Sequence, residues 1–375
     1  MNNTNIHCPM IHGGLNINLK AQNGNLVYNQ CCLSSANLDK LTTPIKMWDS
    51  EALSQLRQQN NNNVWDPGCW ECNSLEKAGL RSFRHAMIDA FGIKKNLSGP
   101  QRIDLLFDRS CNLACMNCGP MSSTFWQKQL KNHNFPVNDY PATNNLETIY
   151  NTLKSLDLSN LEMVQFCGGE TLLGNLYWEA AELIAELVPN AKNKIVLGFQ
   201  TNGTQPIHEK NYKIIEKFHL VKFMISMDGI QDRFEYMRWP ANWNQFVDNI
   251  NNMSEKLPIN VMFFIQETTN CLNLFYHTEV PNWVKENFNT NRLGDPTAHS
   301  TQLVMHPNFN VNNITQEYFD AIGNSNIKNV LEKNWTENPT KINKMLLELD
   351  KFNTITGKNW KVIFPDVVNF YSRYL

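Results

Sequence analysis

The segment RIDLLFDRSCNLACMNC, residues 102–118, joins a short apolar run to three closely spaced cysteines. The run at 102–108 has the residue types of a buried strand. Cys111, Cys115 and Cys118 follow it as a C-x3-C-x2-C loop, and a helix is predicted at 122–133. The segment therefore predicts a strand and a helix joined by a loop that carries three thiols.

The alternation of strand and helix continues along the chain to residue 306. Repeated βα units indicate a parallel sheet or barrel whose site lies at the carboxyl ends of its strands. Strands are predicted at 102–108, 162–166, 194–200, 220–226, 259–266 and 301–306. Helices are predicted between them at 172–187, 209–218, 243–257 and 272–287.

Polar residues follow several of these strands. Gly168, Gly169 and Glu170 come directly after the second one. Two glycines allow a ligand to approach the backbone closely, and a carboxylate accepts hydrogen bonds from an ammonium group. The other strand ends carry Thr201-Asn202-Gly203, Ser226 with Asp228, and Gln266 with Thr268.

The loop at 111–118 is a candidate metal site. Three thiolates can hold a [4Fe–4S] cluster and leave one iron without a protein ligand, which is an open coordination position. Structural zinc is the alternative, but zinc needs a fourth ligand, and no C-x2-C or H-x3-H partner lies close downstream.

Composition narrows the class of protein. The chain has 375 residues, a formal net charge of -2 and 42% hydrophobic residues, which fits one large or two smaller folded domains. The near-neutral charge predicts no nucleic-acid partner. No run of about 18 apolar residues predicts a membrane span. The N-terminus lacks the pattern of a secretory signal, so we expect a cytoplasmic protein whose clustered cysteines serve metal or redox chemistry.

A second group of cysteines lies in the first hundred residues. Cys8 precedes a predicted hairpin with Asn23-Gly24 at its turn, which returns the chain to Cys31-Cys32. A helix at 48–59 and the pair Cys69 and Cys72 follow. Four thiolates from this region fit tetrahedral zinc and a fully ligated [4Fe–4S] cluster equally well.

Taken together, these motifs resemble the radical S-adenosylmethionine (SAM) enzyme superfamily. The resemblance rests on the three cysteines of the loop, the Gly-Gly-Glu at 168–170, the TNGT at 201–204 and the SMDG at 226–229. It implies an α/β fold with a partial (β/α)6 barrel at 100–310 and SAM bound to the open iron. It also implies the SAM-contacting residues Gly168, Gly169, Glu170, Asn202, Ser226, Asp228 and Gln266.

The N-terminal region is similar to the twitch or SPASM-type auxiliary-cluster modules of that superfamily. The hairpin, the paired cysteines and the later Glu76, Gly79, Ser82 and Arg84 carry this similarity. It implies a small α+β module at 1–95 that binds an auxiliary [4Fe–4S] cluster. The implied ligands are Cys8, Cys31, Cys69 and Cys72, with Cys31 preferred over Cys32. In better-known enzymes the module follows the barrel, whereas here it precedes it. A helical extension is expected at 311–375.

The resemblance also implies an activity. Such an enzyme reductively cleaves SAM to a 5'-deoxyadenosyl radical, which abstracts a hydrogen atom from the substrate. A peptide or protein substrate and a reducing partner such as flavodoxin or ferredoxin are expected. The alternatives are an enzyme acting on a small metabolite and a non-catalytic, metal-stabilised binding protein.

Three further residues have two interpretations each. Cys167 is either a catalytic residue beside the Gly-Gly-Glu or a small buried residue that ends a strand, and we expect the second. Cys271 has the same two interpretations, and we expect a buried residue near a helix start. Arg238 is either a clamp for a carboxylate of SAM or substrate, or a solvated surface residue.

The cysteine census predicts the iron content. Anaerobically reconstituted protein should bind about eight iron atoms per chain, because each [4Fe–4S] cluster holds four. Replacing Cys111, Cys115 and Cys118 by Ala should leave about four. Iron and zinc analysis by plasma mass spectrometry checks this, and tightly held zinc without a second cluster would contradict the auxiliary assignment.

Overall fold

The computed structural model describes most of the chain. The described residues are 6–19, 26–34, 44–77, 79, 81–141, 146–288, 299–303, 308–323, 328, 331 and 335–375. The predicted hairpin turn at Asn23-Gly24 and the end of the last predicted strand, 304–306, lie outside them.

The chain forms two compact units, each built from separate stretches of sequence. The first comprises Met1–Arg109, Tyr140–Phe199 and His208–Val221, and the second comprises Ser110–Asp139, Gln200–Ile207 and Lys222–Leu375. The domain division predicted from the sequence, at about residues 95 and 310, stays a prediction.

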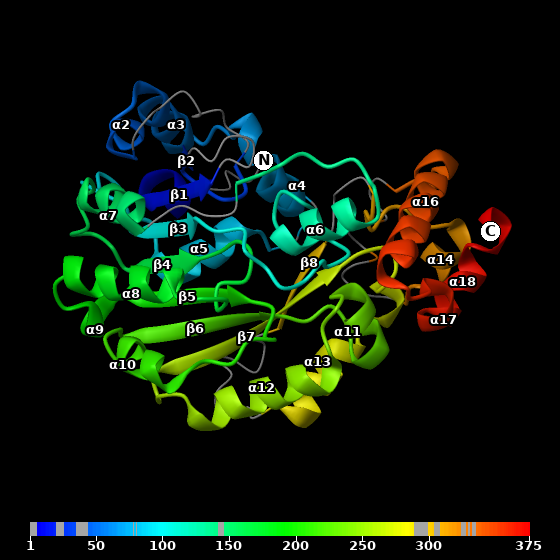
Figure 1. Ribbon diagram of the computed structural model, residues 1–375. Helices are drawn as coiled ribbons and strands as arrows, with labels where there is room; N and C mark the ends of the chain where they lie inside the picture. The colour runs from blue at the N-terminus through cyan, green and yellow to red at the C-terminus, as the bar shows by residue number, and fades with distance from the viewer. Residues whose placement is uncertain are drawn as a thin grey trace. The chain divides into compact units, whose positions relative to one another are not determined.

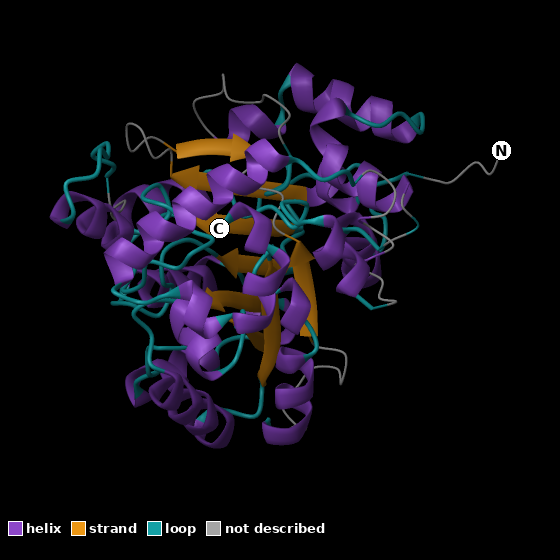
Figure 2. Cartoon of the chain, turned by 90° about the vertical axis from the view of Figure 1, so that its right-hand side faces the viewer, coloured by secondary structure: helices purple, strands orange, loops and turns teal. Residues whose placement is uncertain are grey.

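The strands confirm the predicted mixed α/β fold. They are β1 (Gly14–Leu19), β2 (Leu26–Asn29), β3 (Arg102–Leu106), β4 (Met163–Phe166), β5 (Val196–Thr201), β6 (Leu220–Ser226), β7 (Val261–Thr269) and β8 (His299–Leu303). Their order in the sheet is β2-β1-β3-β4-β5-β6-β7-β8, and Figure 2 shows the strands in orange. The six strands predicted after residue 100 are all present, with ends that differ by a few residues.

The N-terminal hairpin is present but has an unexpected neighbour. β1 pairs with β2 in antiparallel fashion, and its other edge pairs in parallel with β3, with Leu15 opposite Ile103. The hairpin therefore extends the βα sheet, because β1 pairs with β2 along one edge and with β3 along the other.

Figure 1 shows the helices of the first unit in colours from blue to green. They are α1 (Pro9–Gly13), α2 (Pro44–Trp48), α3 (Glu51–Asn61), α4 (Trp70–Lys77), α5 (Phe83–Phe91), α7 (Leu146–Lys154), α8 (Leu176–Leu187), α9 (Ala191–Lys194) and α10 (Tyr212–Ile215). The helix predicted at 48–59 is wrong in its start. The chain instead forms α2 and α3, because the Ser50 hydroxyl accepts the Leu53 N–H and caps a new helix.

The second unit contains the remaining helices. They are α6 (Thr124–Asn132), α11 (Gln231–Met237), α12 (Trp243–Lys256), α13 (Glu279–Asn287), α14 (Gln316–Ala321), α16 (Pro339–Thr356), α17 (Trp360–Ile363) and α18 (Pro365–Phe370). The C-terminal stretch is helical, as expected. None of the described helices combines the length and apolarity that crossing a lipid bilayer requires.

One face of the first unit's sheet is apolar and packs against α8. Every second residue of β1, β3, β4 and β5 on this face is fully buried. The Phe166 ring lies 5.2 Å from that of Tyr177, and the Phe199 ring lies 4.7 Å from that of Trp178. Because side chains alternate along a strand, the residues between these apolar ones face the other side of the sheet. The apolar residues are Leu15, Ile17, Ile103, Leu105, Val164, Phe166, Leu197 and Phe199.

The core of the second unit joins the C-terminal helices to the flank of the cysteine loop. Met116, Trp126 and residues of α16 such as Met345 and Leu349 belong to one buried cluster. Cys271 is fully buried in it, and its thiol donates to the Met345 sulfur at 2.9 Å. The structure thus confirms Cys271 as a core residue.

Candidate functional site

The cysteine loop lies between β3 and α6, as the sequence predicts. Its backbone is fixed to the segment that follows α11: the Ala114 N–H donates to the Trp239 carbonyl at 2.7 Å, and the Met116 N–H donates to the Met237 carbonyl at 2.8 Å. The Trp126 indole donates to the Cys115 carbonyl at 2.8 Å. These bonds fix the backbone immediately before, at and after Cys115, and thereby fix the position of its thiol.

The three thiols lie close enough to change one another's ionisation. A hydrogen bond between Cys115 and Cys118, followed by burial, raises the pKa of Cys115 well above its usual value, and charge on Cys111 raises it further. The same hydrogen bond lowers the pKa of Cys118 to about 7. The three thiols therefore lie near one another, and three thiolates are the number of ligands that a cluster with one free iron requires. In the part of the chain that the structure describes, however, these thiols are not arranged so as to hold a metal ion.

Arg238 lies beside these sulfurs. Its Nη1 atom is 3.9 Å from the Cys115 sulfur, and its Nη2 atom is 2.8 Å from Oδ2 of Asp228. The Asp228 carboxylate is 1% exposed, and its Oδ1 accepts the Thr268 N–H at 2.8 Å. The interpretation of Arg238 as a solvated surface residue is wrong, because the side chain is buried and ion-paired. Its positive charge favours thiolate in the loop.

Asparagines support the loop from two sides. Oδ1 of Asn112 accepts from Nδ2 of Asn202 at 2.9 Å, and Nδ2 of Asn112 donates to the Thr204 hydroxyl at 2.8 Å. On the other side, Nδ2 of Asn270 donates to Oδ1 of Asn117 at 2.9 Å. Sequence reasoning missed Asn112, Asn117 and Asn270, because nothing in their spacing marks partners that lie 90 or more residues away.

The predicted Gly-Gly-Glu turn lies in the first unit, directly after β4. Gly168 and Gly169 have φ values of 88° and 50°, in the left-handed region that favours glycine. A Cβ atom on Gly168 would lie 2.5 Å from Leu106 and 2.8 Å from the Asp108 carbonyl, so the turn passes tightly against the end of β3. Glu170 is 1% exposed, and its Oε1 accepts the Leu172 N–H at 2.9 Å.

Tyr177 ties this turn to the end of β3. Its hydroxyl donates to the Cys167 carbonyl at 2.6 Å and accepts the Asp108 N–H at 3.2 Å. Sequence reasoning missed this tyrosine, which comes from α8 and looked like an ordinary apolar helix residue. Cys167 itself ends the strand as expected, and burial raises the pKa of its thiol.

The remaining predicted SAM contacts lie in the second unit. Ser226 is buried at the end of β6. Gln266 lies on β7, and its Oε1 atom is buried without a hydrogen-bond partner in the described part of the chain. Asn202 and Asp228, by contrast, already bind other groups of the protein. Of the four residues, Gln266 is therefore the one whose side chain has a buried oxygen without a hydrogen-bond partner in the described part of the chain.

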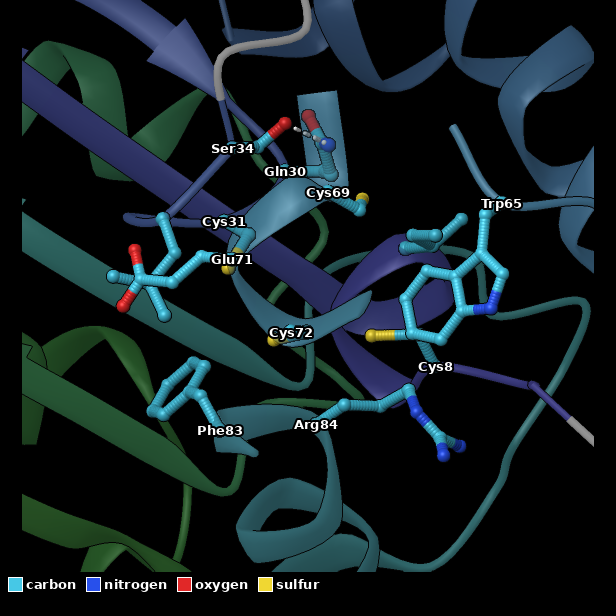
Figure 3. Close-up of a pocket in the computed structure, with 12 residues that line it drawn as sticks. Cys8, Gln30, Cys31, Ser34, Trp65, Cys69, Glu71, Cys72, Phe83 and Arg84 are labelled. Atoms are coloured by element: carbon cyan, nitrogen blue, oxygen red, sulfur yellow. Dashed lines mark hydrogen bonds between the residues drawn. The ribbon is translucent and has the colours of Figure 1, made fainter. Parts of the chain in front are cut away.

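The four predicted auxiliary cysteines line one pocket in the first unit. Figure 3 shows Cys8, Cys31, Cys69 and Cys72 around it, together with Trp65, Phe83 and Arg84. The cavity volume is about 30 Å³. Cys31 lines this pocket, whereas Cys32 is exposed and is not among the lining residues.

These four thiols also influence one another. Burial raises the pKa of Cys8 to about 11 and that of Cys69 to about 12. Charge on Cys72 contributes to both values. A hydrogen bond with Cys32, followed by burial, raises the pKa of Cys31, and charge on Cys8 also raises it. The thiols therefore lie close together although they come from three separate stretches of sequence. Within the described residues, no group of three or more His, Cys, Asp or Glu side chains is placed to hold a metal ion.

An ion pair braces the pocket. Arg84 binds Glu76 through Nε at 2.8 Å and Nη2 at 2.6 Å, and its Nη1 donates to the His7 carbonyl at 3.0 Å. The Ser82 hydroxyl donates to the same carboxylate at 2.5 Å. Three of the residues that carried the similarity to auxiliary-cluster modules thus form one network, next to the segment that begins with Cys8.

Comparisons with known proteins found similarity only among solved structures. No protein-family model matches the chain, and a search of curated proteins found no match. SuiB of Streptococcus suis bound to precursor peptide SuiA has a TM-score of 0.37 and 14% identity, over 63% of this chain and 42% of SuiB. His-tagged anSMEcpe with bound AdoMet has a TM-score of 0.40 and 19% identity, over 69% of this chain and 60% of that one. SuiB bound to SAM has a TM-score of 0.40 and 12% identity, over 91% and 69%. The chain thus spans about half the length of the first two structures.

The Arg238–Asp228 pair generates a prediction about stability. Asp228→Asn should lower the free energy of unfolding by about 3–5 kcal/mol, because it leaves a buried guanidinium without its counter-charge. The double variant Asp228→Asn/Arg238→Met should recover part of the loss, since no unpaired charge remains. Chemical denaturation followed by circular dichroism measures both. Asp139→Asn, which breaks the exposed pair with Lys131, is the control and should change nothing measurable. A single variant as stable as the wild type would contradict the assignment.

Proposed function

We propose that this protein is a radical SAM enzyme that abstracts a hydrogen atom from a peptide or protein substrate. The observation that carries the proposal is the convergence of Cys111, Cys115 and Cys118 beside Arg238. Three thiolates on one backbone loop are the ligand set for a [4Fe–4S] cluster with one open iron. When bound, such a cluster supplies the electron that cleaves SAM to methionine and a 5'-deoxyadenosyl radical.

The chain's own residues bind and orient the reacting groups. The loop bonds of Ala114 and Met116 fix the three thiols, and Arg238 places a positive charge beside the negatively charged sulfurs. A guanidinium at this position stabilises electron density on the thiolates, because opposite charges attract strongly where water is excluded. Arg238 is therefore proposed to act on the cluster ligands and not as a clamp for the SAM carboxylate.

SAM is proposed to contact the residues that follow the strands. The Glu170 carboxylate accepts from the methionyl ammonium, because a charged carboxylate forms strong hydrogen bonds with an ammonium group. The glycines before it allow close approach of the ligand. The free Oε1 of Gln266 accepts from a ligand hydroxyl or amine. The full proposed set is Gly168, Gly169, Glu170, Asn202, Ser226, Asp228 and Gln266.

The pocket lined by Cys8, Cys31, Cys69 and Cys72 is proposed to hold an auxiliary [4Fe–4S] cluster. Four thiolates would ligate every iron, so the substrate would not bind this cluster directly. When bound, it would take an electron from the product radical, relay electrons or only brace the fold. The proposal also includes a reducing partner of the flavodoxin or ferredoxin type and a cytoplasmic location.

The contact between Glu170 and SAM is testable by substitution. Glu170→Gln removes the charge and keeps the shape and the bond to Leu172. A charge-assisted hydrogen bond contributes roughly 1.5–3 kcal/mol, so SAM affinity should fall about ten- to a hundredfold. Equilibrium binding of SAM to reconstituted protein measures the effect, with iron content as the control. Unchanged affinity would show that Glu170 does not hold the ammonium.

The two clusters should differ in role. Replacing Cys69 and Cys72 by Ala should leave reductive SAM cleavage to 5'-deoxyadenosine intact, because the open iron belongs to the loop at 111–118. Formation of modified substrate should fall sharply. Cys118→Ala should abolish both activities. Chromatographic quantification of 5'-deoxyadenosine and of modified peptide separates these outcomes.

Two results would change the assignment. If the folded Cys69/Cys72 variant turns substrate over normally, the auxiliary cluster has a structural role only. If that variant is folded and does not cleave SAM, electrons reach the loop cluster through the auxiliary one. Circular dichroism is the folding control, and Cys271→Ala, which removes a core thiol far from both motifs in sequence, is the matched cysteine control.

A further inference from the structure

A row of polar residues crosses the sheet of the first unit. Asn29 on β2 is the register partner of Asn16 on β1, Asn16 is the partner of Asp104 on β3, and Asp104 is the partner of Gln165 on β4. Gly198 on β5 follows as the partner of Gln165. Because neighbouring strands lie about 4.8 Å apart, these side chains form one continuous line.

The row faces away from the apolar side that packs against α8. Leu15, Ile103, Val164 and Leu197 each come directly before a member of the row, and they belong to the fully buried apolar face. Alternation along the strand puts the row on the opposite face. A polar line in the middle of parallel strands is unusual, because such strands are ordinarily apolar on both faces.

Several atoms of the row are buried acceptors without a hydrogen-bond partner. Asp104 and Gln165 are each 1% exposed. Oδ2 of Asp104, Oε1 of Gln165 and Oδ1 of Asn29 have no partner within the described residues. Buried polar atoms in folded proteins are nearly always hydrogen-bonded, so a group of unpaired acceptors on one face indicates a ligand.

The Gln165 amide is held in one orientation. Its Nε2 donates to the Phe166 carbonyl at 3.0 Å, and because that carbonyl only accepts, the oxygen must be the atom that is free. The amide packs against Gly198, since a Cβ atom there would lie 2.1 Å from Oε1. The protein thus fixes the orientation of the amide.

The Asp104 carboxylate is also fixed. Its Oδ1 accepts from Nε of Arg102 at 2.7 Å, and the Arg102 guanidinium lies 5.3 Å from the Phe83 ring and donates to the Met87 sulfur. Arg102 therefore occupies one carboxylate oxygen and leaves Oδ2 for another donor.

We propose that this row binds a donor-only nitrogen group of a ligand, either an alkyl-guanidinium or an alkyl-ammonium. The unpaired atoms of the row are all acceptors, and guanidinium and ammonium groups carry donors only. A carboxamide would bring an acceptor of its own that the row does not satisfy. Identifying this ligand with a basic side chain of the substrate rests on the proposed function, whereas binding itself does not.

The experiment measures binding of n-butylguanidinium and n-butylammonium to the full-length chain by ligand-observed NMR, without added SAM. Butyramide and butyrate are the matched neutral and anionic probes. The cationic probes should bind, and Gln165→Met should weaken them at least tenfold. Gln101→Met, which alters another buried glutamine that precedes β3 and lies outside the row, should leave the affinities unchanged.

Stability distinguishes a binding row from a structural one. Gln165→Met removes both the unpaired buried oxygen and the Nε2 bond to the Phe166 carbonyl, so the midpoint of unfolding should change little while binding weakens at least tenfold. Asp104→Asn should reduce the preference for butylguanidinium over butyramide. Equal binding to the wild type and Gln165→Met, or no binding of either cation to the wild type, overturns the inference. If the cations bind but the reconstituted protein does not cleave SAM, the inference about the row stands and the proposed function is refuted. If the protein cleaves SAM but binds neither cation, the proposed function stands and the inference about the row is refuted.

Discussion

Electrostatic balance around buried sulfur is the constraint that organises this protein. Three groups of cysteines have an arginine nearby that is tied to a carboxylate. Arg238 with Asp228 lies next to the loop thiols, and Arg84 with Glu76 lies next to Cys8. Arg102 with Asp104 acts in the same way on Cys167, whose pKa burial and Asp104 raise and Arg102 lowers. The carboxylate fixes the guanidinium in place, and the guanidinium offsets negative charge on the sulfur.

This arrangement explains why positions far apart in sequence are coupled. Arg238 reaches Cys115 across 123 residues, and the backbone after α11 also holds the loop. A substitution at Asp228 therefore acts on the cysteine loop without touching it. In the first unit, the contact of Arg84 with the His7 carbonyl ties the start of the chain to α5 in the same way.

Much of the fold follows from the sequence because buried parallel strands are continuous apolar runs that end in polar residues. The strands β4 and β5 could be predicted from their apolar residues Val164, Phe166, Leu197 and Phe199. The turn after β4 could be predicted from Gly168 and Gly169. The parallel pairing of β1 with β3 was not predictable, because an alternating hairpin does not reveal which edge finds a partner. The break at Ser50 was missed because a cap competes with a continuing helix by only about 1 kcal/mol.

The candidate site was predictable where its residues lie close together in the sequence. The spacing of Cys111, Cys115 and Cys118 identified the loop, and the four N-terminal cysteines were brought to one pocket as expected. The supports of the loop were not predictable, since Asn112 and Asn270 are ordinary polar residues until their partners are known. Tyr177 was not predictable for the same reason, because its hydroxyl bonds to groups after β3 and after β4, and their proximity is known only from the structure.

The packing of α16 beside the cysteine loop makes the loop depend on a helix that lies far along the chain. Met345 and Leu349 share one buried cluster with Met116 and Trp126. A cut in the chain between the loop and α16 would therefore expose Met116 and Trp126 to water if α16 came away. The three cysteines of the motif would all be present, but the side chains that support the loop would have lost their packing.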